Sequence, residues 1–285
     1  MSNSLLKRTL VVSALVAVAG ATAVAPAQAD GRHHFGAPDN IAHRGASGEA
    51  PENTLPAIRR ALRQDADFVE VEIQRTADGE LVAARDLTAT TNVAEVFPDR
   101  DPFVENFTLA ELRQLDAGSW FDAEFAGTKI PTLDQVIDIV GYQNGLVIEI
   151  ANAFAHPGIE QDVYDELSDR WYYFSRAIAC DNLVVQSASA PVVSAFHDLA
   201  PSVEVGVVYE ARPSSTTLTS AAAFADRVDV VASRTDQALV DAAHGLDLDV
   251  VVHTVDTEAQ MTAFDDLGVD GISTSFPGLL DDVLG

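Results

Sequence analysis

Basic residues are scarce in this chain. Lysine and arginine together number 17 against 44 aspartates and glutamates, so the formal net charge of the 285 residues is −27 at pH 7. Only two of the basic residues are lysines, Lys7 and Lys129. A surface this acidic repels the phosphate backbone of nucleic acids and repels anionic lipid, so we exclude both as primary partners. The same charge attracts divalent cations.

Cysteine is almost absent as well. The single thiol, Cys180, excludes an intramolecular disulfide. No cluster of cysteine and histidine has the spacing of zinc ligands, which argues against a zinc site. We therefore expect Cys180 to be a buried structural residue.

Long apolar runs are missing beyond the N-terminus. No later segment stays apolar over the roughly 18 residues of a membrane helix, so we expect no integral membrane association of the mature chain. The N-terminus is typical of a cleaved export signal, because a basic pair precedes the apolar run Thr9–Val24 and small residues end at Ala29. A membrane anchor is the alternative, but the run is short for one. We expect residues 1–29 to be removed, residues 30–39 to form a short linker, and the mature protein to be extracellular or periplasmic.

Short apolar, β-branched runs alternate with helical patterns from residue 40 onward. Such alternation predicts parallel strands joined by crossover helices, and eight strands in a chain of this length predict a (β/α)₈ TIM barrel over residues 40–285. The predicted strands are Asn40–His43, Phe68–Ile73, Leu146–Ile150, Leu183–Gln186, Val203–Tyr209, Val228–Ala232, Asp249–Thr254 and Gly271–Thr274. The predicted helices include Thr54–Gln64, Leu133–Val140 and Glu258–Leu267.

One apolar run, Glu80–Ala84, breaks the alternation. It follows the turn signal Ala77-Asp78-Gly79, so we predict a hairpin that extends the second strand. Residues 86–131 then form a long insertion with a helical segment at Leu109–Leu115. A connection of this length usually carries function or a small structure of its own.

Polar residues at the carboxyl ends of barrel strands are candidates for chemistry, because active sites of such barrels lie there. His43 closes the first strand and suits general acid–base work, Arg44 can bind a phosphate in a fork, and Gly45 lets the backbone approach a ligand. Glu52 and Asn53 follow within ten residues. They read either as substrate-binding groups beside His43 or as part of the N-terminal cap of the next helix.

Three glutamates point to a metal site. Glu70 and Glu72 stand two apart on one strand and so face the same side, and Glu149 lies near the end of the next barrel strand. Carboxylates directed into one barrel mouth repel one another unless a cation lies between them. Oxygen ligands of this kind suit Ca²⁺ or Mg²⁺. The alternative is that each glutamate pairs with an arginine at the rim.

Several motifs together resemble one family. The stretches are IAHRGASGEAPENTLPAI, DFVEVEIQRTADGELVAARDLTATTN, GSWF with GTKIPTLDQVI, GLVIEI and LGVDGISTSFP. Their order and spacing over residues 40 to about 280 resemble the glycerophosphodiester phosphodiesterases, and VFPDRDPFVENFTLAELRQLDAGSW is similar to the insertion of their exported, periplasmic-type branch. The resemblance implies a barrel enzyme that uses one divalent cation to cut small-molecule phosphodiesters such as glycerophosphocholine into glycerol 3-phosphate and an alcohol.

The resemblance also implies roles for single positions. His43 matches one catalytic histidine, Arg44 the phosphate-binding arginine, and Glu70, Glu72 and Glu149 the metal ligands. Arg85 stands where the family has its second catalytic histidine.

Further departures lie around the same site. Ala151 stands where a lysine is usual, His253 replaces a tryptophan, and Ser275 replaces a common aspartate. Arginine stays protonated at any relevant pH, so Arg85 can neutralise phosphate charge but cannot exchange a proton. His253 either supplies the missing proton transfer or only fills the space of the tryptophan.

Two functions remain in view from the sequence. The first is a hydrolase of glycerophosphodiesters with His43 as its main acid–base residue. The second is a barrel that binds phosphodiesters or lipid headgroups without turning them over, which the arginine at position 85 favours. The sequence leaves the oligomeric state open.

Overall fold

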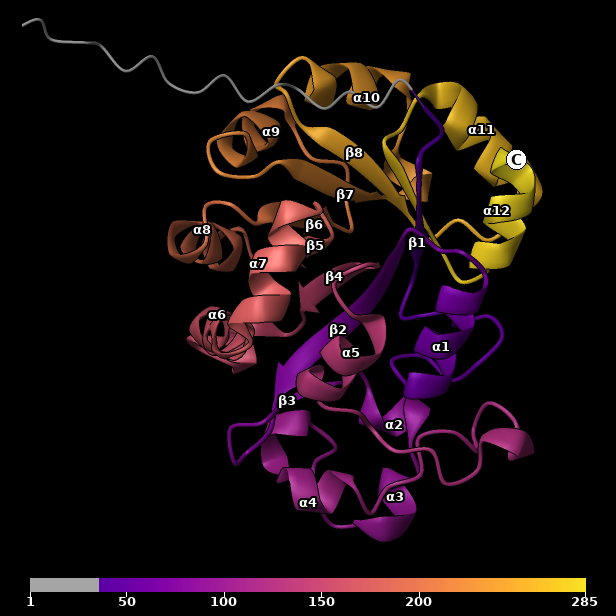
Figure 1. Ribbon diagram of the computed structural model, residues 1–285, viewed down its shortest axis with the longest axis vertical. Coiled ribbons are helices and arrows are strands. Elements are labelled where there is room, and N and C mark those ends of the chain that lie inside the picture. The colour runs from indigo at the N-terminus through magenta and orange to yellow at the C-terminus, as the bar shows by residue number, and fades with distance from the viewer. Residues whose placement is uncertain (1–35) are drawn as a thin grey trace, which may run out of the picture. The chain divides into compact units, whose positions relative to one another are not determined.

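The computed structural model describes residues 36–285, and the predicted signal segment 1–29 lies outside them. Eight parallel strands close into a barrel in the order β1-β9-β8-β7-β6-β5-β4-β2, with β1 also paired to β2 (Figure 1). The strands are β1 (Asp39–Ala42), β2 (Phe68–Arg75), β4 (Gly145–Ile150), β5 (Leu183–Ser187), β6 (Glu204–Tyr209), β7 (Arg227–Val231), β8 (Asp249–His253) and β9 (Gly271–Thr274). The predicted fold is confirmed, and all eight predicted runs are strands.

Helices surround the barrel and follow its strands. They are α1 (Leu55–Arg63), α5 (Leu133–Val140), α6 (Ile159–Asp169), α7 (Trp171–Ala179), α8 (Ala190–Leu199), α9 (Ser215–Ala221), α10 (Gln237–His244), α11 (Glu258–Leu267) and α12 (Pro277–Leu284). Each buries an apolar stripe against the outward side chains of the strands, as Leu133, Val136 and Ile137 of α5 do. This layer between helices and strands holds most of the apolar core.

The inside of the barrel is built differently. Its buried apolar cluster contains Ile41, Val147, Val184 and Val251, with Phe68 packed against it. Polar side chains from the same strands are buried alongside, and they include Glu70, Glu72, Gln186, Arg227 and Asp229. Buried charges of this kind require partners, so the inside of the barrel is where chemistry is expected.

The hairpin and the insertion form a second small structure. β3 (Leu81–Ala83) pairs antiparallel with β2, as predicted. The insertion contains α2 (Leu87–Thr90), α3 (Val93–Val96) and α4 (Leu109–Leu112), with 3₁₀ turns at Val104–Asn106 and Ala123–Phe125. These elements lie together at one side of the barrel (Figure 1).

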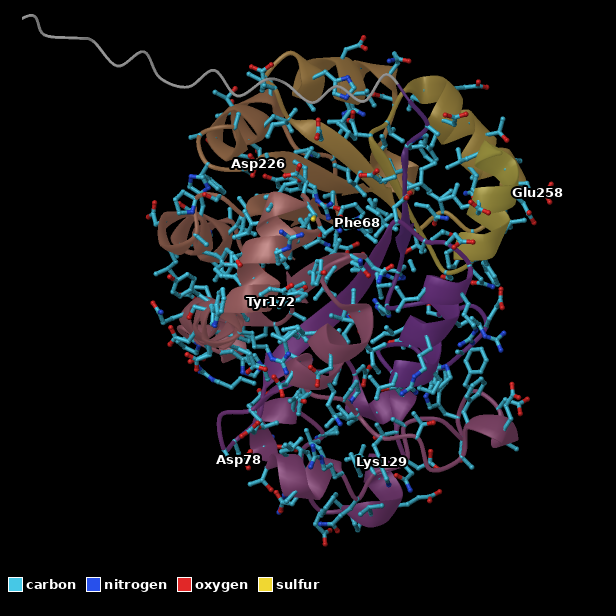
Figure 2. The ribbon with its side chains drawn as sticks, viewed as in Figure 1. Phe68, Asp78, Lys129, Tyr172, Asp226 and Glu258 are labelled. Atoms are coloured by element: carbon cyan, nitrogen blue, oxygen red, sulfur yellow. The ribbon has the colours of Figure 1, made fainter. Side chains whose placement is uncertain are left out.

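The insertion has an apolar cluster of its own. Phe107, Leu112 and Leu115 are buried there with residues of β3 and α2. Asp78 and Lys129, both labelled in Figure 2, tie the segment together. Asp78 accepts a hydrogen bond from the amide of Leu109 at 2.9 Å, and Lys129 donates to the carbonyl of Leu115 at 2.9 Å.

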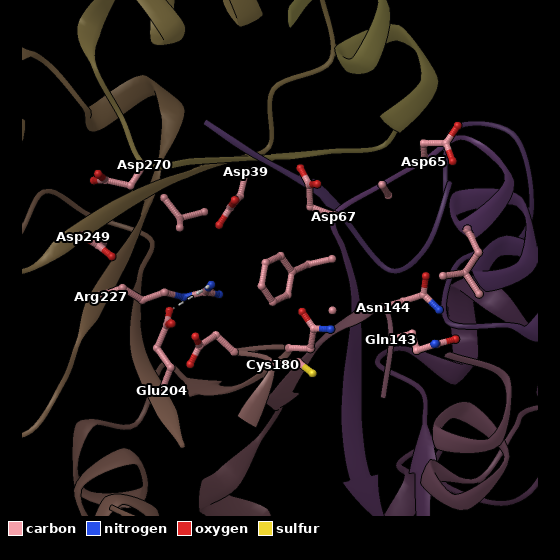
Figure 3. A pocket seen from close by; sticks show the side chains of 17 residues that line it. Asp39, Asp65, Asp67, Gln143, Asn144, Cys180, Glu204, Arg227, Asp249 and Asp270 are labelled. Carbon is pink, nitrogen blue, oxygen red and sulfur yellow. Dashed lines mark ion pairs between the residues drawn. The ribbon is translucent and has the colours of Figure 1, made fainter. Parts of the chain in front are cut away.

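A cavity of about 550 Å³ opens at the amino-terminal ends of the strands (Figure 3). Acidic side chains dominate its wall, including Asp39, Glu204, Asp249 and Asp270, and Arg227 reaches Glu204 at 3.9 Å. Cys180 also lines this cavity and is exposed, so the expectation of a buried thiol was wrong. The reason is its position at the end of α7, where the chain turns back into β5 at the barrel rim.

Candidate active site

A small cavity at the carboxyl ends of the strands gathers most of the predicted site residues. Its volume is about 20 Å³. Its lining residues are His43, Glu70, Glu72, Arg85, Glu149, Gln186, Val208, Glu210, Asp229 and His253. Residues from seven strands or the loops directly after them therefore meet at one point, at the end of the barrel opposite the cavity of Figure 3.

The turn after β1 places Arg44. Both Arg44 and Gly45 have a left-handed backbone, with φ of 57° and 79°. A Cβ at position 45 would lie 2.7 Å from the backbone carbonyl carbon of Ala57 in α1. Gly45 thus allows a helix rather than a ligand to approach the backbone, which corrects the role expected from the sequence. The tight contact fixes the turn from which Arg44 points into the site.

Arg44 is held by two carboxylates. Its Nη1 donates to Oε2 of Glu52 at 2.8 Å, and its Nε lies 2.9 Å from Oε2 of Glu72. Asn53, also left-handed at φ 55°, receives a bond from the Glu72 amide at 3.0 Å and donates to Glu72 Oε2 at 3.2 Å. Glu52 and Asn53 therefore belong to the site and organise Arg44 and Glu72. Helix capping does not account for this segment, because the Thr54 hydroxyl donates to the carbonyl of Pro51 and makes no capping bond to α1.

The three predicted carboxylates lie close together and are buried. Burial, and after it the charges of Glu149 and Glu72, raises the pKa of Glu70 well above its usual value. Burial also raises the pKa of Glu149, and raises that of Glu72 to about 7, where the guanidinium groups of Arg44 and Arg85 limit the rise. These shifts have one physical meaning: negative charge accumulates here beyond what the arginines offset.

Neighbouring strands supply supports that the sequence reasoning missed. Ser273 of β9 donates to Glu70 Oε2 at 3.2 Å, and Gln186 of β5 donates to Glu149 Oε2 at 3.0 Å. Arg227 of β7 in turn binds the side-chain oxygen of Gln186 and lies 3.2 Å from Asp229. Asp229 stands among valines in Arg227–Val231, which is the signal that singled out Glu149, so it could have been found in the same way.

The donor set fits a hard divalent cation. Three buried carboxylates with raised pKa values offer oxygen ligands, and a dication would offset their repulsion. Over residues 36–285, however, no three histidine, cysteine or acidic side chains are already arranged to hold a metal ion. Glu72 explains this: its oxygens are engaged by Arg44, Asn53 and Arg85. Glu70 and Glu149 carry the fit, and Glu72 joins them when Arg85 releases it.

Two histidines lie on the cavity wall. His43 Nε2 is 3.8 Å from Glu70 Oε1, and burial followed by the charge of Arg44 lowers the pKa of His43 well below its usual value. Burial likewise lowers the pKa of His253, whose Nε2 is 4.0 Å from Glu210 Oε1. Both rings are therefore neutral near pH 7 and able to accept a proton.

Arg85 lies at the base of the insertion, two residues after β3 ends. Its Nη1 is 2.9 Å from Glu72 Oε1, and its side chain is 47% exposed. The sequence placed an arginine in the site but did not show its partner. In the structure it is an ion-pair partner of a predicted metal ligand.

A second pocket, of about 360 Å³, opens beside the carboxylate cavity. The two share Glu72, Arg85, Glu149, Val208 and Glu210. The loops after β4 and β5 supply the remaining wall, which consists of Ile150, Ala151, Asn152, Ala153, Phe154, Ser187, Ala188 and Ser189. We call it the side pocket.

The sequence from residue 43 to residue 279, which contains this whole site, matches the Glycerophosphoryl diester phosphodiesterase family. The chain belongs to this family. Its members are phosphoric diester hydrolases, as the site residues at the barrel mouth led us to expect.

Curated members of the phosphodiesterase family match over most of their length. A glycerophosphodiester phosphodiesterase of Bacillus subtilis is 31% identical over 91% of this chain and 92% of its own. One from Bacillus altitudinis is 30% identical over 83% of this chain and 94% of its own.

Solved structures agree with the family assignment. A phosphodiesterase of Oleispira antarctica, solved in complex with the product sn-glycerol 3-phosphate, superposes with a TM-score of 0.71 at 26% identity, over 87% of this chain and 96% of its own. A glycerophosphodiester phosphodiesterase of Agrobacterium tumefaciens shares the fold, with a TM-score of 0.66 at 23% identity over 86% of this chain and 99% of its own. Within residues 36–285, no helix combines the length and apolarity needed to cross a bilayer.

Proposed function

We propose that the protein hydrolyses glycerophosphodiesters to glycerol 3-phosphate and an alcohol, using one divalent cation. The proposal is supported above all by one observation: His43 and three buried glutamates line a single cavity inside a chain whose residues 43–279 match the family. The product bound in the Oleispira antarctica relative supports the same substrate class.

The residues of the site divide the work. The neutral His43 accepts the proton of the attacking oxygen, and the bond between phosphorus and the headgroup oxygen breaks as the new phosphorus–oxygen bond forms. Arg44, with its guanidinium anchored by Glu52 and Glu72, presents positive charge to the phosphate. The departing alkoxide takes up a proton, a step for which His253 is the candidate on the opposite wall.

Glu70, Glu72 and Glu149 would hold the cation, Ca²⁺ or Mg²⁺. When bound, it supplies Lewis-acid polarisation of the phosphoryl oxygens. Calorimetry of Ca²⁺ and Mg²⁺ binding tests the ligand set. We expect Glu72→Gln to weaken cation affinity more than tenfold, and an unchanged affinity would remove Glu72 from it.

A second function, binding without turnover, is favoured by one observation. Arg85, which cannot exchange a proton, holds Glu72 at 2.9 Å where the family has a catalytic histidine. A coupled assay for glycerol 3-phosphate, run on several glycerophosphodiesters with Ca²⁺ and with a chelator, separates the two functions. Release that requires the cation supports the hydrolase, and tight substrate binding without release supports the binding protein.

The N-terminal segment extends the proposal to location. We expect cleavage after Ala29 and a mature protein outside the cytoplasm, as its basic pair and apolar run indicate. Mass spectrometry of the N-terminus of the protein recovered from the culture medium or the periplasm checks this.

A further inference from the structure

The side pocket has no part in the chemistry described above, yet it adjoins the reaction site. It shares Glu72, Arg85 and Glu149 with the carboxylate cavity. A group attached to a phosphorus atom above those carboxylates would therefore extend into it. We propose that the side pocket selects a leaving alcohol with an alkylammonium headgroup, such as choline, through Glu210 and Phe154. This inference rests on the proposed function and adds its substrate class.

Size and shape favour a compact headgroup. Most of the wall consists of small side chains, which include Ala151, Ala153, Ala188, Ser187 and Ser189. They leave a space of about 360 Å³, within the range of small-molecule sites. The hydroxyl groups of the two serines suit a polar headgroup but do not by themselves decide its charge.

The charges on the wall decide it. Arg44 and Arg85 are matched by Glu52 and Glu72, to which they are ion-paired. Glu149 is assigned to the cation together with Glu70. What remains on the wall of the side pocket is the carboxylate of Glu210.

Glu210 directly follows β6 and its side chain is 69% exposed, so it faces incoming solute rather than the core. Its neighbour on the inner side is His253, with Nε2 at 4.0 Å. A cationic headgroup in the pocket would meet an unmatched carboxylate, whereas an anionic one would be repelled.

Phe154 points to the same ligand. It lies in the turn Ala153–Ala155 and is 88% exposed, although it lines the side pocket. An aromatic face left in water at a pocket wall is suited to an alkylammonium group, which such faces attract by a cation–π interaction. Glu210 and Phe154 come from the loops after β6 and β4, so the pocket presents a carboxylate and an aromatic ring from different strands.

Paired substrates isolate the role of charge. Glycerophosphocholine and its uncharged isostere, the diester of 3,3-dimethylbutanol, have the same shape and release the same glycerol 3-phosphate. We expect kcat/KM to favour glycerophosphocholine by about tenfold, the sum of a modest ion pair and a cation–π contact. Equal values of kcat/KM for the two diesters in the wild type would overturn the proposal.

Two variants assign the preference to residues. Glu210→Gln should reduce it about 3- to 5-fold, and Phe154→Leu, which keeps an apolar side chain but removes the ring, about 3-fold. Glu258→Gln is the control, because it removes the same charge from an exposed position on α11, away from the pocket lining. A preference that survives Glu210→Gln, or that falls equally in Glu258→Gln, would contradict the assignment to Glu210.

Calorimetry separates failure of this inference from failure of the proposed function. The affinities of both diesters are measured with Ca²⁺ present. Tighter binding of glycerophosphocholine without release of glycerol 3-phosphate supports the headgroup assignment and refutes the hydrolase. Release of glycerol 3-phosphate from both diesters with equal affinities and rates refutes the headgroup assignment alone.

Discussion

Replacing Arg85 by histidine should raise the rate of glycerol 3-phosphate release at least tenfold. An arginine cannot exchange a proton at neutral pH, whereas a histidine can. A positioned acid–base group contributes roughly 10²–10⁴ in rate. We expect the lower end or less, because the imidazole is shorter than the guanidinium that now reaches Glu72.

The same substitution should tighten cation binding. Arg85 Nη1 lies 2.9 Å from Glu72 Oε1, and its side chain is about half exposed, so this ion pair contributes about 0.5–1 kcal/mol. A cation that uses Glu72 must displace it. At about 1.4 kcal/mol per tenfold change, removal of the arginine should lower the dissociation constant of Ca²⁺ or Mg²⁺ about 2- to 5-fold.

Arg85→Gln separates the two effects. It removes the positive charge without adding an acid–base group. Both variants should bind the cation more tightly by calorimetry, but only Arg85→His should gain rate in the coupled assay and a new limb in its pH–rate profile. An equal gain in rate for both variants, or none for the histidine, would refute the reasoning about proton transfer.

Three further predictions concern single residues. His253→Phe should remove one limb of the pH–rate profile and lower the rate about 10²-fold; a rate equal to wild type would leave His253 a packing role. Asp249→Asn should stabilise the protein at pH 8 by about 1 kcal/mol in urea unfolding, and not near pH 4. Burial and the charge of Asp270 raise the pKa of Asp249 to about 7, so its contribution to stability is present below its unfolded pKa and is lost as pH rises through 7. Gly45→Ala should lower the free energy of unfolding by at least about 2 kcal/mol in the same assay, because its Cβ would meet the backbone of Ala57; an unchanged midpoint would contradict that.

The strands could be predicted because their sequence signal is local. Valine-rich runs of four to eight residues follow one another with helical patterns between them, and the barrel topology leaves little choice in how they pair. The antiparallel β3 was recognised from its turn. The same local signal brought Glu70, Glu72 and Glu149 to one end of the barrel, since residues two apart on a strand share a face.

What could not be predicted depends on contacts between distant segments. No pattern in the sequence shows that Glu72 is bound by both Arg44 and Arg85, because the three lie on different elements. Glu210 stands in the first residue after a strand, where many polar residues have no function. The role of Gly45 depended on how closely α1 approaches the turn, which is a matter of packing rather than of sequence.

The position of Arg85 has a consequence for the dynamics of the site. The residue lies where the hairpin passes into the insertion, and Val82 and Ala84 beside it belong to the insertion's own apolar cluster, separate from that of the barrel. Segments with their own core can open as a unit with less free energy than global unfolding requires. Opening of the insertion alone would withdraw Arg85 from Glu72 while β1, β2 and β4 kept the glutamates in place. The availability of Glu72 to a cation would then follow the local stability of residues 86–131, and amide hydrogen exchange in that segment would report it.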